Sequence, residues 1–138
     1  MVTAATIDAE SGEGQKTQEF ALEVFPESAY DLVVSKQCHL NFKLTGITVG
    51  NDNLDLINSS DLNISIISLC CGDINGDGHI NSSDLSVIIV PANYGKQISE
   101  AFVNKLADLN GDGHINSSDL SIVIVPANYG KTHVVYAY

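Results

Sequence analysis

The first half of the chain contains short stretches in which apolar residues alternate with polar ones or β-prone residues cluster, as in half-buried strands. These stretches are residues 19–24, 30–35, 40–49 and 62–69. Turn-forming residues separate them, and Gly46 within the third stretch predicts a kink or bulge. We therefore expect a small all-β antiparallel sandwich with almost no helix over residues 1–70.

The second half of the chain contains an internal repeat. Residues 73–96 and 108–131 are identical at 21 of 24 positions, and the three differences exchange one aliphatic residue for another. Such a duplication predicts two copies of one loop–helix unit, packed face to face about a pseudo-two-fold axis. We expect these copies to form a second, all-α domain over residues 71–138.

Each repeat begins with a loop whose spacing is typical of calcium ligation. Loops of the EF-hand kind place oxygen-bearing side chains at positions 1, 3, 5 and 12 and a glycine at position 6. Those side chains are Asp73, Asn75, Asp77 and Asp84 in the first loop, and Asp108, Asn110, Asp112 and Asp119 in the second. Two nearly identical loops at a fixed interval favour two bound Ca²⁺ ions.

A third partial copy of the loop lies at residues 57–62, which are identical to residues 80–85. Aligning this copy places Gly50 at position 1 and Leu54 at position 5, so two of the required oxygens are missing. Turn-forming polar residues explain the match, and we expect no third calcium site.

The residues after each loop are expected to form a helix, although their β-branched side chains favour a strand. Position 12 of a calcium loop opens the exiting helix, and Leu85, Ile88, Ile89 and Ala92 then share one helical stripe. Each helix should kink or break at its proline, because a proline ring clashes with the preceding turn. The prolines are Pro91 and Pro126, followed by the expected C′ glycines Gly95 and Gly130 and the helix-end lysines Lys96 and Lys131.

Two further segments lie outside the repeats, one between them and one after them. Residues 99–107 predict a short helix with Ser99 as N-cap and with Phe102 and Leu106 facing the core. No comparable helix is expected before the first loop. The apolar residues of 132–138 are expected to clasp back onto the first repeat.

Charge and composition narrow the class of partner. The formal net charge is −11 with only six Lys and Arg, which excludes a basic surface for nucleic acid or anionic membranes. The chain has no apolar run of membrane-spanning length and its first residues do not resemble a signal peptide. Because calcium loops of modest affinity work best where calcium is plentiful, we interpret the chain as part of a larger secreted protein whose leader lies upstream.

The three cysteines do not form a disulfide framework. Cys38 has the choice of pairing with Cys70 or Cys71, and free buried thiols are an equal alternative. No motif for catalysis lies outside the calcium loops, so we expect no enzyme activity.

The two loops, each of the form Asp-x-Asn-x-Asp-Gly-x-Ile-Asn-x-x-Asp-Leu, and the lack of a first entering helix resemble a type I dockerin over about residues 72–132. Residues 19–70 resemble, less specifically, the small prealbumin-like β-sandwich, or X-type module, that often precedes dockerins. The resemblance implies a non-catalytic module that binds a cohesin of a scaffoldin in an extracellular or cell-surface cellulosome of an anaerobic bacterium. It also implies that the carbonyls of His79 and His114 complete the calcium ligands, and that the module is a monomer before it docks.

The resemblance also implies which residues contact the partner. They are Ser82, Ser83, Ile89, Val90 and Tyr94 in the first repeat, and Ser117, Ser118, Ile124, Val125 and Tyr129 in the second. Many family members carry basic residues where this chain has Ile89, Val90 and their counterparts, so a more apolar partner surface is expected. Core packing is the alternative role for Ile89 and Ile124. The near-identity of the repeats predicts two interchangeable binding orientations.

An EF-hand calcium sensor or buffer is the alternative function. A sensor needs an entering helix, a glutamate at position 12 and a methionine-rich groove. This chain has aspartate at position 12 and one methionine, Met1. The docking function is therefore favoured.

Overall fold

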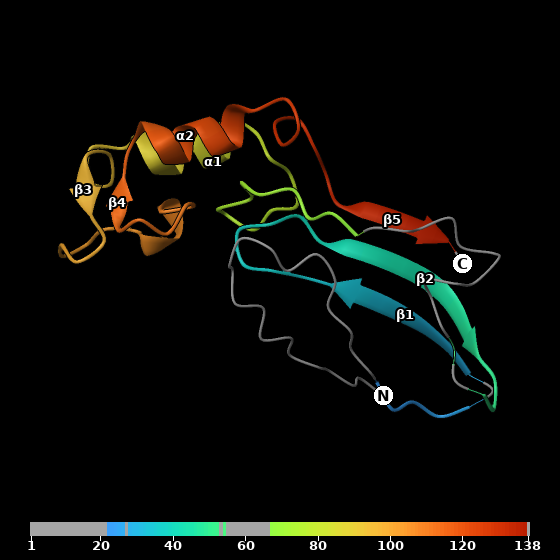
Figure 1. The fold of residues 1–138 in the computed structure, drawn as a ribbon. Coiled ribbons are helices and arrows are strands. Elements are labelled where there is room, and N and C mark those ends of the chain that lie inside the picture. The colour runs from blue at the N-terminus through green and yellow to red at the C-terminus, as the bar shows by residue number, and fades with distance from the viewer. Residues whose placement is uncertain (1–21, 27, 53, 55–66, 138) are drawn as a thin grey trace.

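The structure is a computed structural model that describes residues 22–26, 28–52, 54 and 67–137. A three-stranded sheet lies on one side of the molecule and a pair of short helices on the other (Figure 1). The expected combination of an N-terminal β module and a C-terminal helical unit is present. The partial third copy of the loop at residues 57–62 lies outside the described residues.

The sheet has the order β1–β2–β5. Strands β1 (Ser28–Val34) and β2 (Phe42–Val49) are antiparallel, and their register shifts opposite Gly46, which confirms the bulge. Gly46 has a φ of +77°, and its N–H donates to Asp31 Oδ1 at 3.2 Å. The buried side chains of Phe42, Leu44 and Ile47 form the core of this sheet.

The third strand, β5 (Val134–Ala137), comes from the end of the chain and pairs parallel to β2. The sheet is therefore mixed, whereas a purely antiparallel arrangement was expected. Sequence alternation does not reveal this pairing, because a parallel neighbour can come from any distance along the chain. A second sandwich layer is not seen among the residues that the structure describes.

Two expected strands are not formed in their described parts. Residues 22–25 are coil, and at their end the Phe25 N–H donates to the Tyr30 hydroxyl, which donates to Phe25 O, both at 3.0 Å. Residues 67–69 are also coil, and pairing begins only where Cys71 bridges His39. The remaining residues of both stretches lie outside the described range.

The repeats form the helices α1 (Ser82–Ile89) and α2 (Ser117–Ile124). Asn81 and Asn116 are the N-caps, and each forms a capping box with the aspartate at loop position 12. Both helices end just before the prolines, which confirms the expected break. The C-cap residue Val90 already has extended backbone, with φ −59° and ψ 139°.

The expected roles of the glycines and lysines at the helix ends are wrong. Gly95 and Gly130 lie beyond a turn that follows each proline, so they are not C′ residues and Lys96 and Lys131 do not follow a helix end. The Gly95 N–H instead donates to Ile115 O at 2.8 Å. The proline ends the helix before these residues can cap it.

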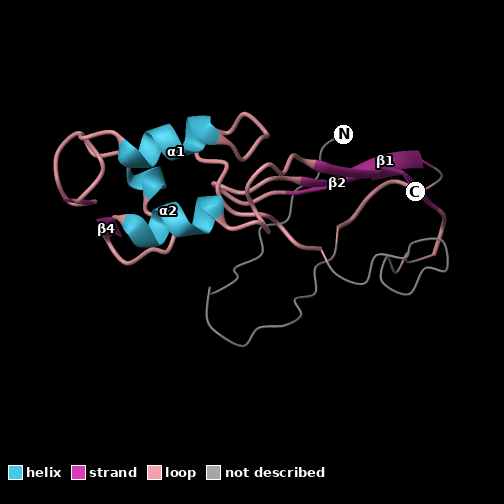
Figure 2. Ribbon diagram, turned by 90° about the horizontal axis from the view of Figure 1, so that it is seen from above, coloured by secondary structure: helices cyan, strands magenta, loops and turns pink. Residues whose placement is uncertain are grey.

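The end of each repeat is hydrogen-bonded to the loop of the other repeat. The Gly95 N–H donates to Ile115 O, and the Gly130 N–H donates to Ile80 O, both at 2.8 Å. The end of each helix thus lies beside the start of the other, and the helices run antiparallel side by side (Figures 1 and 2). This reciprocal pairing is the expected pseudo-two-fold arrangement.

The core between the repeats is small and aliphatic. Its buried residues are Leu40, Ile74, Ile80, Ile88, Ala107, Ile115 and Val123. Leu40 comes from the loop before β2, so the N-terminal segment contributes directly to the helical core. Within the expected stripe of α1, Ile88 is buried whereas Ile89 and Ala92 are exposed.

The expected helix over residues 99–107 is not formed. The segment consists of turns, followed by the 3-10 helix η1 (Lys105–Ala107), whose N-cap is Asn104. Strand β3 (Lys96–Gln97) pairs with β4 (His114–Ile115) and holds the start of the segment against the second loop. Phe102 is fully exposed with a φ of +67°, while Leu106 packs against the core as expected.

Candidate metal loops and docking face

Loop 1 (residues 73–84) is shaped by its own side chains. Asp73 Oδ2 accepts the Gly78 N–H at 3.1 Å, and Asn75 Oδ1 accepts the Asp77 N–H at 2.9 Å. Asp77 in turn accepts the His79 N–H at 2.9 Å and the Asn75 side-chain amide at 3.0 Å. The residues at positions 1, 3 and 5 therefore hold the loop in a tight coil.

Loop 2 (residues 108–119) repeats these bonds. Asp108 Oδ2 accepts the Gly113 N–H at 2.9 Å, and Asn110 Oδ1 accepts the Asp112 N–H at 3.0 Å. The pKa of Asp112 lies below its usual value because the Asn110 amide, and then the His114 N–H, donate to its carboxylate. This carboxylate therefore stays ionised, as a cation ligand must.

The aspartates at position 12 join the two ends of their loops. Asp84 accepts N–H groups of Ile74 at 2.8 Å, Asn75 at 3.3 Å and Asn81 at 2.9 Å. Asp119 makes the same three bonds at the same distances, and both carboxylates are fully buried. A carboxylate oxygen has further lone pairs, so these bonds leave room for a metal ligand role.

The donor chemistry of the loops fits a hard divalent cation. Carboxylate and amide oxygens are the ligands that calcium prefers. Asp73 is 4% exposed, and its Oδ1 is buried without a hydrogen-bond partner, which suits an oxygen facing a cation. Within the described residues, no three His, Cys, Asp or Glu side chains already converge as a metal cluster. The three aspartates of each loop therefore do not converge on one point in this structure, and the calcium ligand set stays a prediction.

The histidines at loop position 7 have exposed side chains. His79 forms a bridge with Thr132, and His114 pairs with Gln97 in the β3–β4 ladder. Both residues are therefore held by their backbones, whose carbonyls are the ligands implied by the resemblance.

The residues expected to contact a partner are all exposed. Ile89 and Ile124 are 54% and 51% exposed, so the alternative role in the core is wrong. Val90, Tyr94, Val125 and Tyr129 are also exposed, as are the serines that open each helix. We call this set the docking face: Ser82, Ser83, Ile89, Val90 and Tyr94 with Ser117, Ser118, Ile124, Val125 and Tyr129.

Two asparagines that the sequence did not single out hold the backbone under the docking face. Asn93 is 4% exposed and its Nδ2 donates to Val87 O at 2.6 Å. Asn128 makes the matching bond to Ile122 O at 2.7 Å. These bonds fix the turn after each proline, which carries Tyr94 and Tyr129. The signal was the identical Pro-Ala-Asn-Tyr-Gly run in both repeats.

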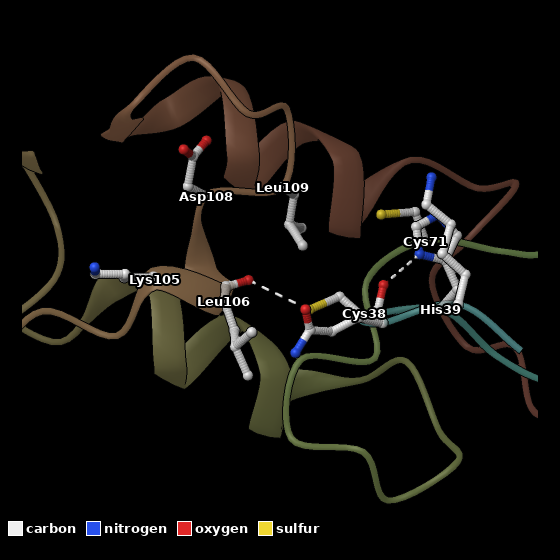
Figure 3. Close-up of a pocket in the computed structure, with 9 residues that line it drawn as sticks. Cys38, His39, Cys71, Lys105, Leu106, Asp108 and Leu109 are labelled. Carbon is white, nitrogen blue, oxygen red and sulfur yellow. Dashed lines mark hydrogen bonds between the residues drawn. The ribbon is translucent and has the colours of Figure 1, made fainter. Parts of the chain in front are cut away.

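An open pocket of about 230 Å³ lies between the loop before β2 and the start of loop 2 (Figure 3). Cys38 and Cys71 line it, and the Cys38 thiol donates to Leu106 O at 3.5 Å. Burial raises the pKa of both thiols and lowers the pKa of His39. All three cysteines lie within the described residues, and they are free but only half-buried, so neither expected pairing of Cys38 is formed. Protonated thiols at this junction act as packing groups.

No helix in the described part of the chain is long and apolar enough to cross a membrane. A search of curated proteins found no match.

Residues 71–125 match the family model of the dockerin type I domain.

Three solved structures are similar to this chain. A type II cohesin–dockerin domain from Bacteroides cellolosolvens is 41% identical to this chain, with a TM-score of 0.36. The aligned region covers 48% of this chain and 92% of the Bacteroides chain. An N-terminal interface mutant of a type II cohesin–X-dockerin complex from Acetivibrio cellulolyticus is 25% identical and covers 80% and 68%, with a TM-score of 0.56. The C-terminal interface mutant of that complex is 26% identical over the same shares, with a TM-score of 0.57.

The family match and the geometry coincide. The matched range contains both loops and both helices, and the similarity to the Acetivibrio structures extends over 80% of the chain. Residues 71–125 therefore form a dockerin domain.

Proposed function

We propose that this chain is a non-catalytic module that docks its parent protein onto a cohesin of a scaffoldin in an extracellular cellulosome. The observation that carries this proposal is the dockerin match over residues 71–125. The cohesins named in the similar structures support the same class of partner.

We propose further that each loop holds one calcium ion. The ligands would be Asp73, Asn75, Asp77, Asp84 and the His79 carbonyl in loop 1, and Asp108, Asn110, Asp112, Asp119 and the His114 carbonyl in loop 2. Bound calcium supplies positive charge that offsets the mutual repulsion of three carboxylates in each loop. Because the core between the repeats is small, this contribution would decide whether the repeats fold.

The docking face predicts the chemistry of the partner surface. Four aliphatic and two tyrosine side chains are exposed on it, with serine hydroxyls at the helix starts. Its members carry no charge, so a complementary cohesin surface should be largely apolar with hydrogen-bonding groups at its ends. Aromatic residues are frequent anchors in interfaces, which favours Tyr94 and Tyr129 as major contacts.

The N-terminal sheet is proposed to be a companion module of the X type. Both Acetivibrio structures contain an X module, and their similarity to this chain covers more than its dockerin domain. Leu40 packs in the helical core, which supports a fixed rather than a flexible attachment.

Calorimetric titration of the full chain against a panel of cohesins tests the main proposal. The panel should contain type I and type II cohesins, because the family model is type I and the similar complexes are type II. We expect calcium-dependent binding that disappears with a chelator. The double variant Ile89→Asp/Ile124→Asp should abolish binding, because a charge on each helix would be buried without a partner. Binding that is independent of calcium, or no binding to any cohesin, would contradict the proposal.

The two orientations need a separate test. If either repeat can occupy the same partner surface, changing Ser82 and Ser83 to bulky residues should weaken binding only about twofold, since the other orientation remains. The same change at Ser117 and Ser118 should have the same effect, and both changes together should abolish binding. If the first change alone abolishes binding while the second has no effect, the module docks in one orientation.

A further inference from the structure

The last residues of the chain connect loop 1 to the N-terminal sheet. We call residues 130–137 the strap. Its first half pairs with loop 1, where the Ile80 N–H donates to Lys131 O at 3.0 Å and the His133 N–H donates to Gly78 O at 3.3 Å. Its second half is β5, which pairs with β2 and places Tyr136 against Phe42 with ring centroids 5.4 Å apart. One segment therefore contacts both parts of the molecule (Figure 1).

His133 lies at the point where the strap passes from the loop to the sheet. Its Nδ1 accepts the Asn41 N–H at 2.9 Å, and the Val134 N–H donates back to Asn41 O at 3.2 Å. On its other side the ring lies against Gly78, where an added Cβ would come within 2.6 Å of Nε2. The imidazole is thus held between position 6 of loop 1 and the residue before β2.

Loop 2 lacks this connection although its backbone is the same. The residue that corresponds to His133 is Ile98, whose N–H donates to Gly113 O at 3.1 Å. A Cβ added to Gly113 would meet nothing within 4 Å. The φ angles of Gly78 and Gly113 are +84° and +86°. The two glycines therefore differ in their neighbours and not in their conformation.

We propose that His133 couples the metal state of loop 1, and not that of loop 2, to the packing of the N-terminal sheet. The inference rests on the proposal that both loops bind calcium. Fixing the backbone of loop 1 fixes Gly78, and Gly78 positions the His133 ring that bonds Asn41 and aligns β5. Such coupling is reciprocal, so an ordered strap also raises the calcium affinity of loop 1.

The two glycines provide a matched pair of variants in the full chain. Gly78→Ala and Gly113→Ala carry the same backbone strain, but only the first adds a methyl group that displaces the His133 ring. Amide hydrogen exchange of β2 and β5 should be measured by mass spectrometry in saturating calcium. We expect these strands to exchange about tenfold faster in Gly78→Ala than in Gly113→Ala. Equal exchange in the two variants would overturn the coupling.

His133→Ala tests the same contact without changing the loop. It should accelerate exchange of β5 as Gly78→Ala does, and the double variant Gly78→Ala/His133→Ala should be no faster than His133→Ala alone. If β5 exchanges in His133→Ala as in the unchanged chain, the histidine does not carry the coupling.

A second pair of variants tests the role of the metal. Asp77→Ala should accelerate exchange of β5 more than Asp112→Ala does, because the His133 ring lies against loop 1 and not against loop 2. Calcium titrations by calorimetry on the same samples separate the two proposals. If the unchanged chain binds no calcium, the proposed function fails. If loop 1 binds calcium but β5 exchanges equally with and without it, only the coupling fails.

Discussion

Loop 1 and loop 2 differ in one residue, Ile74 against Leu109, but they lie in different surroundings. Inside each loop the bonds to the aspartate at position 12 are the same. At position 1 they diverge: Asp73 Oδ1 is buried without a partner, whereas Asp108 Oδ1 accepts the Gly111 N–H at 2.9 Å. Both loops pair with the end of the other repeat, through the His79–Thr132 bridge and the β3–β4 ladder. The difference lies at position 6, where the His133 ring lies against Gly78 but a Cβ added to Gly113 would meet nothing within 4 Å.

The repeated sequence determines the local structure of each loop, but it does not determine which other parts of the chain lie against that loop. Side chains that bond within their own loop or helix produce the same local structure twice. The end of the pair that faces the N-terminal sheet nevertheless has neighbours that the other end lacks. We therefore expect the proposed docking face to rest on two loops that differ in stability and in affinity for calcium.

The largest effects should come from the aspartates at position 12, and the part that comes from the lost hydrogen bonds should be equal in the two loops. Asp84→Ala and Asp119→Ala each leave three backbone N–H groups without their acceptor in a buried place. We expect each to lower the free energy of unfolding by about 3 kcal/mol or more. Urea denaturation in saturating calcium measures both.

The conservative variants Asp84→Asn and Asp119→Asn are the controls. They keep one side-chain oxygen as an acceptor, so they should cost less than the alanine variants. A difference of more than about 1 kcal/mol between the two alanine variants would show that the surroundings reach position 12.

A smaller and unequal effect is expected at the asparagines behind the docking face. Asn93 and Asn128 both bond the end of their helix, but Asn93 Oδ1 also accepts the Asn104 N–H at 2.9 Å. Asn93→Ala should therefore lower the free energy of unfolding by about 1 kcal/mol more than Asn128→Ala. Thermal denaturation of the two variants gives this difference directly. Equal losses would mean that the bond to Asn104 contributes nothing net.

The sequence predicted the features that depend on local chemistry. The loops and the helix ends at the prolines follow from residues within a few positions of each other. The N-caps Asn81 and Asn116 are equally local but were not predicted. The bulge at Gly46 was also predictable, because glycine adopts positive φ without strain. The exposure of Ile89 was not predictable from periodicity alone, since a helix of eight residues contacts its partner over a narrow stripe.

Features that depend on distant neighbours were missed. Turns and the 3-10 helix η1 replace the helix expected from residue 99, and just before them the Ile98 N–H donates to Gly113 O of the second loop. The parallel strand β5 joins a sheet whose other strands lie about ninety residues earlier in the chain, as in the Thr45 hydroxyl bond to Tyr136 O at 3.1 Å. Local propensity contains no information about either contact.

The smallest effect is expected at Asp31, which tests how far the asymmetry of the loops extends into the sheet. The Lys43 ammonium at 2.8 Å, and then the Gly46 N–H, hold the pKa of Asp31 below its ordinary value of 3.8. A lowered pKa in the folded chain means that the contribution to stability is complete above the ordinary pKa and is lost as pH falls through the folded value. Asp31→Asn should therefore be slightly less stable than the unchanged chain at pH 7, and the gap should close in acid. Because Gly46 lies within β2, five residues after Asn41, calcium titration at pH 7 should show the same difference in affinity between loops 1 and 2 in this variant as in the unchanged chain. A change in the affinity of loop 1 alone would mean that the whole strand, and not only its first residues, responds to the metal.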